Sequence, residues 1–270
     1  MKDFNTLVVR SLTGAVFVAV IIASLLFHSY AAFVVFGVAM YVSYAESMKM
    51  IGSGGINFRL KKMIAMLIYG SVYMYSTSAM EISPLFFISP FLICFGIIEL
   101  YNKNGETLKN IAYDVFSLIY IILPFSLVNI MLNNGAEFNG MILLAIFFLI
   151  WVNDSFAYLF GVSFGKHRLW ERISPKKSWE GFVGGALSTI VVSYFGAKYF
   201  FPEMMWQMVG LSLIVVVFGT FGDLFESQLK RQFGLKDSGN ILPGHGGFLD
   251  RFDSFLFIIP MAMVYLQIVA

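Results

Sequence analysis

Long apolar runs recur along this chain, and short polar stretches separate them. Apolar and polar residues do not alternate with a period of two within the runs, which favours helices over a membrane β-barrel. Because a helix needs about 20 apolar residues to cross the hydrocarbon core of a bilayer, we expect about nine transmembrane helices. The predicted spans are Leu12–Phe27, Ala31–Tyr44, Met63–Met80, Pro84–Ile98, Ile111–Leu132, Met141–Phe164, Phe182–Phe201, Met205–Phe221 and Phe255–Val269. The sequence therefore predicts an all-α, polytopic integral membrane protein.

The basic residues provide an independent check of this count and indicate an orientation. When the N-terminus is placed in the cytoplasm and the sides alternate after each span, 17 of the 18 Lys and Arg residues lie inside and only Lys198 lies outside. Cytoplasmic loops of membrane proteins carry such an excess of Lys and Arg. We therefore expect a cytoplasmic N-terminus, an outer C-terminus and a location in the cell (inner) membrane.

Composition narrows the class of protein further. Of the 270 residues, 59% are hydrophobic and only 13% are charged, which excludes an ordinary soluble domain, a disordered chain and nucleic acid as a partner. The single cysteine, Cys94, excludes an internal disulfide and a cysteine-based zinc site. We expect residues 1–140 to hold about five scaffold helices with lipid access. Residues 141–270 are then expected to hold the remaining helices and two cytoplasmic catalytic loops.

Asp154 lies inside an otherwise apolar span, where a charged side chain is unexpected. A charge near the centre of a membrane helix costs about 2.5–3.5 kcal/mol on the insertion scale. The carboxylate is therefore expected to face a cavity or a partner. Two interpretations remain open at this point: a ligand for a metal or substrate, and a hydrogen bond between helices.

Two pairs of carboxylates lie at the cytoplasmic ends of the last two predicted spans. Asp223 and Glu226 are three residues apart, and so are Asp250 and Asp253, so each pair shares a helical face. Four such groups repel one another unless a cation or basic groups lie between them. Carboxylate oxygens together with substrate phosphates suit Mg²⁺. The alternative is a pair of solvated helix ends, with the acids of the last span favourable to the helix dipole.

The two cytoplasmic loops, Gly165–Gly181 and Gly222–Asp253, carry half of the basic residues. In the first loop, adjacent Lys176 and Lys177 suit phosphate binding, although positive-inside signalling explains them equally well. In the second loop, Pro243–Gly247 contains three glycines, and the backbone N–H groups of such a turn can bind an anion. The basic residues around this turn are Lys230, Arg231, Lys236 and Arg251. Taken together, the loops indicate chemistry on an anion with a divalent metal at the cytoplasmic face.

The residues of the second loop form one long pattern. Its fixed positions fall within 27 residues and are Ser227, Lys230, Arg231, Lys236, Asp237, Gly239, Pro243, Gly244, His245, Gly246, Gly247, Asp250, Arg251 and Asp253. This pattern resembles the signature of the phosphatidate cytidylyltransferase family, also called CDP-diacylglycerol synthases. The upstream stretches Asp154–Gly161 and Ser174–Gly181 resemble two further segments of that family. The resemblance covers about Asn153–Ser254 and is loose before residue 140.

The resemblance implies transfer of the cytidylyl group of CTP to phosphatidate, which forms CDP-diacylglycerol and pyrophosphate and requires Mg²⁺. It implies Asp223 and Asp250 as metal ligands and catalytic residues, with Asp154 as a third carboxylate or as an orienting residue. The residues expected to bind the phosphates or to shape the turn around the nucleotide are Lys176, Lys177, Ser178, Lys230, Arg231, Lys236, His245, Gly246, Gly247 and Arg251. CTP, phosphatidate and membrane lipids are the expected partners.

Two other functions compete with this interpretation. One is a different Mg²⁺-dependent membrane lipid transferase, although no Asp-Asp-x-x-Asp motif is present. The other is a secondary transporter that uses Asp154 as an intramembrane ion site, although the outer loops lack the charges of a polar pathway. Oligomeric state also stays open. Gly184 and Gly185 favour close packing against another helix, either in this chain or in a second copy, so a homodimer is one interpretation.

Overall fold

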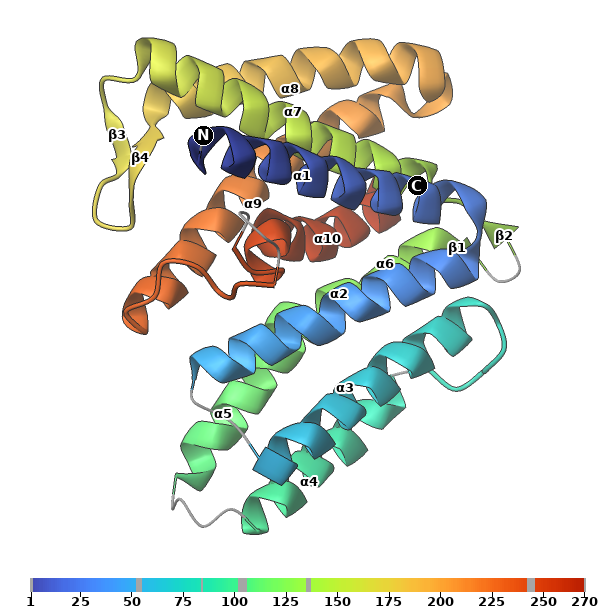
Figure 1. Ribbon diagram of the computed structural model, residues 1–270. Coiled ribbons are helices and arrows are strands. Elements are labelled where there is room, and N and C mark those ends of the chain that lie inside the picture. The colour runs from blue at the N-terminus through green and yellow to red at the C-terminus, as the bar shows by residue number, and fades with distance from the viewer. Residues whose placement is uncertain are drawn as a thin grey trace. The chain divides into compact units, whose positions relative to one another are not determined.

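The computed structural model of the protein describes residues 2–51, 55–83, 85–101, 106–134, 137–241 and 246–269 (Figure 1). Most of these residues are helical. The chain divides into two compact units, Met1–Met141 with Asp237–Arg251, and Ile142–Lys236 with Phe252–Ala270. Each unit has its own packing.

The first unit is a bundle of helices that carries one small hairpin. Its elements are α1 (Lys2–Phe27), α2 (Ser29–Met50), α3 (Gly55–Ser76), α4 (Leu85–Leu100), α5 (Thr107–Ser117), η1 (Leu118–Ile122), α6 (Leu123–Leu132), β1 (Asn133–Asn134), β2 (Glu137–Phe138) and the start of α10 (Leu249–Val269). Successive helices pack against one another from α1 to α5, and α6 packs against both α2 and α3. The two short strands pair in antiparallel fashion.

Local sequence explains several features of this unit. The His28 side chain accepts a hydrogen bond from the Tyr30 N–H (3.1 Å) and so caps the start of α2. A π-helical turn, η1, joins α5 to α6 directly before Pro124, a residue that cannot donate a backbone hydrogen bond. At Gly37 the absence of a side chain makes room for the Tyr69 ring, so α2 and α3 approach closely. The Tyr69 hydroxyl then donates to the Phe33 carbonyl (2.9 Å).

The second unit combines long helices with a β-hairpin. Its elements are α7 (Met141–Phe164), β3 (Arg168–Trp170), β4 (Ser174–Ser178), α8 (Trp179–Phe200), η2 (Pro202–Met204), α9 (Met205–Gln232) and the greater part of α10. α8 packs extensively against α9, and the antiparallel hairpin β3–β4 leads directly into α8. In Figure 1 this hairpin projects beyond the ends of α7 and α8.

Small residues bring the helices of the second unit into close contact. A Cβ atom at Gly184 would overlap the Phe160 ring, and one at Gly185 would lie 3.0 Å from Ala157 Cβ. The glycine pair therefore packs against α7 of the same chain. Between α9 and α10, the Ser254 hydroxyl donates to the Gly219 carbonyl (3.0 Å). These contacts fix the helices on which the charged residues of the unit lie.

Each of the nine predicted spans overlaps a helix in the described part of the chain. Among the described residues, five helical segments are long and apolar enough to cross a membrane: Ser29–Met50, Thr107–Leu132, Met141–Phe164, Pro202–Gln232 and Leu249–Val269. Ser11–Phe27 and Pro90–Leu100 are shorter apolar helical stretches. The fold is thus mostly helical, with several membrane-type helices.

The structure differs from the expected boundaries at several points. Helix α3 ends at Ser76, before the predicted end of its span at Met80. Helix α9 continues to Gln232, well beyond the predicted end of its span, because the Glu226–Lys230 pair at i and i+4 supports the extension. Helix α10 begins at Leu249, earlier than predicted. The stretch Gly165–Gly181, expected as a loop, contains the β3–β4 hairpin, so the fold is not purely helical.

Candidate active site

The second unit contains a cavity of about 680 Å³, lined by residues of α7, β3, β4, α8 and α9. Its volume falls within the range of about 300–1,000 Å³ that is usual for small-molecule sites. The cavity brings together five of the residues expected to be functional: Asp154, Lys176, Lys177, Ser178 and Asp223. Two acidic and two basic side chains therefore share one concave surface.

Asp154 lies on α7, and its exposed side chain lines the cavity. The start of α8 packs closely against α7 beside this side chain. At Gly181 a Cβ atom would lie 2.7 Å from the Ala157 carbonyl and 3.2 Å from Gly161 Cα. The start of α8 therefore lies directly against α7. The prediction that Asp154 faces a cavity is confirmed.

An ion pair joins opposite sides of the cavity. Lys177 Nζ lies 2.6 Å from Asp223 Oδ2, and the two side chains are 27% and 35% exposed. The Ser227 hydroxyl donates to Asp223 Oδ1 (3.3 Å) from one turn further along α9. Lys177 is held in place because β4 pairs with β3. The pair joins a carboxylate suited to a metal with a lysine suited to a phosphate.

Asp253, on α10, does not line the cavity but lies near its charged residues. The charges of Asp223, Asp154 and Lys177 all act on its carboxyl group. Asp253 Oδ1 accepts a hydrogen bond from the Ser254 N–H (2.6 Å). From the sequence, Asp253 was only the second member of the pair with Asp250. Its spacing was the signal that singled it out, but the spacing does not show which member of the pair meets Asp223.

The donor set fits a hard divalent cation. The described residues contain no group of three or more His, Cys, Asp or Glu side chains placed to hold a metal alone. Mg²⁺ does not need such a group, since it is usually held by one or two carboxylates together with substrate phosphates and water. Asp223 and Asp154 both line the cavity and are the carboxylates that would supply such ligands, and Lys177 is the counter-ion of Asp223 in this structure.

Ser178 has a structural role in addition to its place in the lining. Its buried hydroxyl oxygen accepts a hydrogen bond from the Gly181 N–H (3.1 Å) and so caps the N-terminus of α8. Lys176, two residues earlier, is exposed at the rim. The segment Lys176–Ser178 therefore presents two ammonium groups directly before a helix N-terminus, where anions are favoured.

Three of the expected phosphate-binding residues do not line this cavity. Lys230 is buried and lies 2.7 Å from Glu226 Oε2. The Arg231 guanidinium donates to the Leu235 carbonyl (2.8 Å), which closes the end of α9. Lys236 is exposed in the turn that follows. Their role in binding substrate stays a prediction.

The remaining expected residues belong to the first unit. Asp250 Oδ2 accepts hydrogen bonds from the Ser238 N–H (3.0 Å) and the Gly247 N–H (2.8 Å). Gly246 has a φ of 79°, a conformation that favours glycine, as expected for the turn. Arg251 is exposed. His245 lies outside the described residues.

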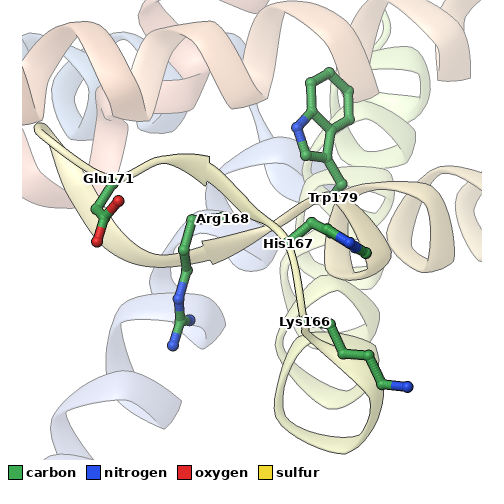
Figure 2. A pocket seen from close by; sticks show the side chains of 5 residues that line it. All are labelled: Lys166, His167, Arg168, Glu171 and Trp179. Carbon is green, nitrogen blue, oxygen red and sulfur yellow. The ribbon is translucent and has the colours of Figure 1, made fainter.

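A second hollow, of about 870 Å³, lies beside the hairpin and is wide open. Figure 2 shows the side chains that line it, which are Lys166, His167, Arg168, Glu171 and Trp179. Arg168 lines both this hollow and the cavity, and no motif in the sequence distinguished it from the other basic residues. It is therefore a candidate phosphate ligand that sequence reasoning missed.

A contact between His167 and Glu180 closes the base of the hairpin. His167 Nδ1 lies 2.6 Å from Glu180 Oε1, and the His167 N–H also donates to this carboxylate (3.2 Å). The backbone N–H of Glu180 itself, followed by the His167 side chain, lowers the pKa of Glu180 from its ordinary value of 4.5 to about 2. The carboxylate is therefore charged at any physiological pH, and it ties the start of β3 to the start of α8.

The fold and the cavity describe a mostly helical protein with several membrane-type helices and a cavity lined by both carboxylates and lysines. The model of the cytidylyltransferase family matches residues 8–269, and the chain belongs to this family. The family expected from the sequence signature is thereby confirmed.

The names of similar proteins agree with this family. The chain is similar to proteins named phosphatidate cytidylyltransferase from Staphylococcus aureus (strain COL), with 42% identity over 167 residues, and from Staphylococcus haemolyticus, with 36% identity over 192 residues. The first alignment covers 61% of this chain and 62% of the relative, and the second covers 70% of each. The match to the S. aureus protein thus spans less than two thirds of its length.

Proposed function

We propose that this protein transfers the cytidylyl group of CTP to phosphatidate, with release of pyrophosphate. The observation that carries the proposal is the cavity in which Asp154, Asp223, Lys176 and Lys177 meet. Membership of the cytidylyltransferase family and the names of the relatives support the choice of nucleotide and lipid.

The charges of the cavity suit a nucleotide triphosphate bound with a divalent cation. Lys176, Lys177 and Arg168 supply positive charge toward phosphate oxygens, while the N-terminus of α8 adds a favourable dipole. Asp223, with Asp154 or Asp253, would hold Mg²⁺, which when bound neutralises charge on the phosphates. The carboxylates of the cavity would thereby bind the metal, and the ammonium groups would bind the phosphates.

In the proposed reaction a phosphate oxygen of phosphatidate attacks the α-phosphorus of CTP. The new P–O bond forms as the bond to the β-phosphate breaks, and pyrophosphate leaves with both of its phosphates. Such nucleotidyl transfer depends mainly on positioning and on neutralisation of charge. In this proposal the lysines hold the leaving phosphates, and the carboxylates would hold the divalent cation that neutralises these phosphates. The reaction requires no strong general base from the protein.

The proposal also places the protein in a membrane. Five described helices are long and apolar enough to span one, which suits an enzyme whose lipid substrate stays in the bilayer. The distribution of Lys and Arg supports about nine spans, a cytoplasmic N-terminus, an outer C-terminus and an active site that faces the cytoplasm. CTP would then reach the cavity from the cytoplasm, and phosphatidate would enter from the inner leaflet of the cell membrane.

The test is an assay of the purified protein in detergent micelles with labelled CTP, phosphatidate and Mg²⁺. We expect liponucleotide and pyrophosphate in equal amounts, loss of both with EDTA, and recovery on addition of Mg²⁺. Asp223→Asn and Asp250→Asn should each reduce turnover by at least about 100-fold, a typical loss when one preorganised charge is removed from a site. Glu203→Gln, which changes an exposed acid of η2 in the second unit, is the matched control. Folded wild-type protein that forms no liponucleotide would contradict the proposal.

Asp253→Asn separates the structural view of the site from the sequence motif. Because the charges of Asp223 and Asp154 act on Asp253, this variant should lose as much activity as Asp223→Asn. Near wild-type turnover in Asp253→Asn would remove this carboxylate from the site.

A further inference from the structure

Glu46 is a buried carboxylate that no motif in the sequence indicates. It lies on α2, and only 3% of the residue is exposed. Glu46 Oε2 accepts a hydrogen bond from the Leu249 N–H (2.9 Å), the first backbone amide of α10. The same oxygen accepts a second hydrogen bond from the Ser238 hydroxyl (3.1 Å). One carboxylate oxygen of α2 thus joins two residues that flank the glycine-rich turn.

Asp250 joins the same two flanks independently. Its Oδ2 atom accepts the Ser238 N–H and the Gly247 N–H. Two carboxylates, one from α10 itself and one from α2, therefore connect Ser238 to Gly247 and Leu249. Since Ser238 binds Glu46 through its hydroxyl and Asp250 through its backbone N–H, the position of Asp250 is coupled to Glu46 through a single residue.

Two glycines of the signature are explained by this contact. A Cβ atom at Gly239 would overlap Glu46 Oε1. At Gly247 it would overlap the Ser238 hydroxyl and would lie 2.6 Å from Glu46 Oε2. Both positions have to lack a side chain because the carboxylate approaches the backbone directly. Gly239 and Gly247 of the signature thus leave room for the Glu46 carboxylate, which lies outside the signature in the sequence.

Energetics indicate that the contact is not incidental. Burial of a carboxylate is costly unless hydrogen bonds compensate it. The Leu249 N–H and the Ser238 hydroxyl supply such bonds to Glu46 Oε2, and the N-terminus of α10 favours a negative group at this point. The same bonds fix the backbone that precedes Asp250.

From these contacts we infer that Glu46 is a positioning residue for cytidylyl transfer. Glu46 holds Ser238 and Leu249 in place and, through Ser238, the Asp250 carboxylate. The inference rests on the proposed function, since it concerns the geometry of residues assigned to that reaction. Glu46 itself does not touch substrate; it acts through Ser238 and the start of α10.

The experiment compares wild type, Glu46→Gln, Glu46→Ala and the control Glu81→Ala, which removes an exposed carboxylate of the same unit. Hydrogen exchange, followed by mass spectrometry on the full chain in micelles, reports on residues 234–252 without any need for catalysis. Glutamine keeps an oxygen that accepts both hydrogen bonds, whereas alanine removes both. We expect exchange in this segment to be at least tenfold faster in Glu46→Ala and close to wild type in Glu46→Gln and Glu81→Ala.

Activity provides the second readout. In Glu46→Ala, kcat should fall at least tenfold while the KM for CTP changes less than threefold, and Glu46→Gln should restore kcat to within threefold of wild type. If Glu46→Ala does not fold, Ser238→Ala removes one of the two hydrogen bonds and should accelerate exchange in the same segment alone.

Two outcomes overturn the inference. One is unchanged exchange of residues 234–252 in Glu46→Ala. The other is an increase that extends evenly over the whole first unit, which would make Glu46 a general determinant of stability. Because exchange is measured without substrate, its result holds even where wild type shows no cytidylyl transfer. Failure of the proposed function is therefore distinguishable from failure of this inference.

Discussion

Lys177 Nζ lies 2.6 Å from Asp223 Oδ2, and the two residues reach the same cavity from β4 and from α9. Both side chains are about one third exposed, and an ion pair of this kind contributes only about 0–1 kcal/mol to stability. The pair is therefore easily separated when a stronger partner arrives. A triphosphate with its metal offers a stronger partner to each of the two residues. The phosphate oxygens would bind Lys177, and the divalent cation would bind Asp223.

Removal of the Lys177 ammonium should lower kcat/KM for CTP while changing the stability of the protein only slightly. A hydrogen bond between a charged donor and a phosphate contributes about 1.5–3 kcal/mol, so Lys177→Ala should reduce kcat/KM for CTP by about 10- to 100-fold. Lys177→Arg should retain part of the activity because it keeps the charge. Steady-state kinetics with CTP as the varied substrate measure the effect.

The matched control for this prediction is Lys198→Ala, which removes an exposed lysine from the other end of α8. It should leave kcat/KM within about twofold of wild type. Equal losses in Lys177→Ala and Lys198→Ala would mean that net charge, rather than contact with the nucleotide, governs the rate.

Close packing of α7 against α8 predicts opposite effects for two glycines of the same helix. Gly181→Ala places a Cβ atom 2.7 Å from the Ala157 carbonyl, and such overpacking typically costs about 1–3 kcal/mol. At Gly196 nothing lies within 4 Å of the added atom, and alanine favours helix formation by up to about 1 kcal/mol. Thermal unfolding in detergent should therefore give a lower Tm for Gly181→Ala and an unchanged or higher Tm for Gly196→Ala. Two similar shifts would contradict the close approach of the helices.

A buried ion cluster holds three helices of the first unit together. Lys61 Nζ lies 2.7 Å from Glu99 Oε1 and 2.8 Å from Asp114 Oδ2, and all three side chains are at most 6% exposed. The Asn110 amide also donates to Glu99 Oε2 (2.8 Å). One ammonium thus compensates two carboxylates on α4 and α5.

Lys61→Met should destabilise this unit strongly, since removal of one partner leaves buried charge without compensation, at a cost of about 3–5 kcal/mol. Arg59→Met, two residues earlier and exposed, is the control and should change stability by less than about 0.5 kcal/mol. The triple variant Lys61→Met, Glu99→Gln and Asp114→Asn should recover much of the loss. A triple variant as unstable as Lys61→Met alone would show that the lysine stem, rather than the charge, is what the bundle requires.

Hydropathy predicted the positions of the helices because an apolar helix is defined by its own sequence. The short hairpin β3–β4 escaped prediction, since strands of three and five residues rich in Lys and Arg carry no alternating pattern. The sequence places Asp223 and Glu226 on a helical face but does not predict that α9 continues to Gln232, because the following polar residues are typical of a loop. The i and i+4 spacing of Glu226 and Lys230 was the signal that could have corrected this.

The sequence motifs singled out several residues that line one cavity, but they did not indicate residues that contact one another across the fold. Asp154 stands out because a carboxylate is unexpected inside an apolar span, and Lys177 because adjacent lysines suit phosphate binding. Both side chains line the cavity. Glu46 is far from the signature in the chain, so only tertiary structure shows that it binds Ser238. Asp253 was visible as a spacing, but the choice between it and Asp250 depends on how α10 faces its neighbours.

The contact between His167 and Glu180 predicts how the hairpin responds to acid. Hydrogen bonds from its own backbone N–H and from the His167 side chain lower the pKa of Glu180 from 4.5 to about 2. A carboxyl whose pKa is lowered by folding stabilises the folded form fully above its unfolded value. That contribution is lost as the pH falls through the folded value. The hairpin should therefore loosen progressively between pH 4.5 and pH 2.

Glu180→Gln should remove this dependence, because the amide does not titrate, and it should leave the hairpin less tightly held at neutral pH. Trp170 and Trp179 are about half exposed at the hairpin and at the start of α8, so their fluorescence reports its opening. Wild type should show a red shift of emission from pH 4.5 to pH 2 that Glu180→Gln lacks. The control Glu171→Gln, at the tip of the same hairpin, should titrate like wild type. A wild-type curve that is flat over this interval, or one that Glu180→Gln reproduces, would show that the pair does not control the closure of the hairpin.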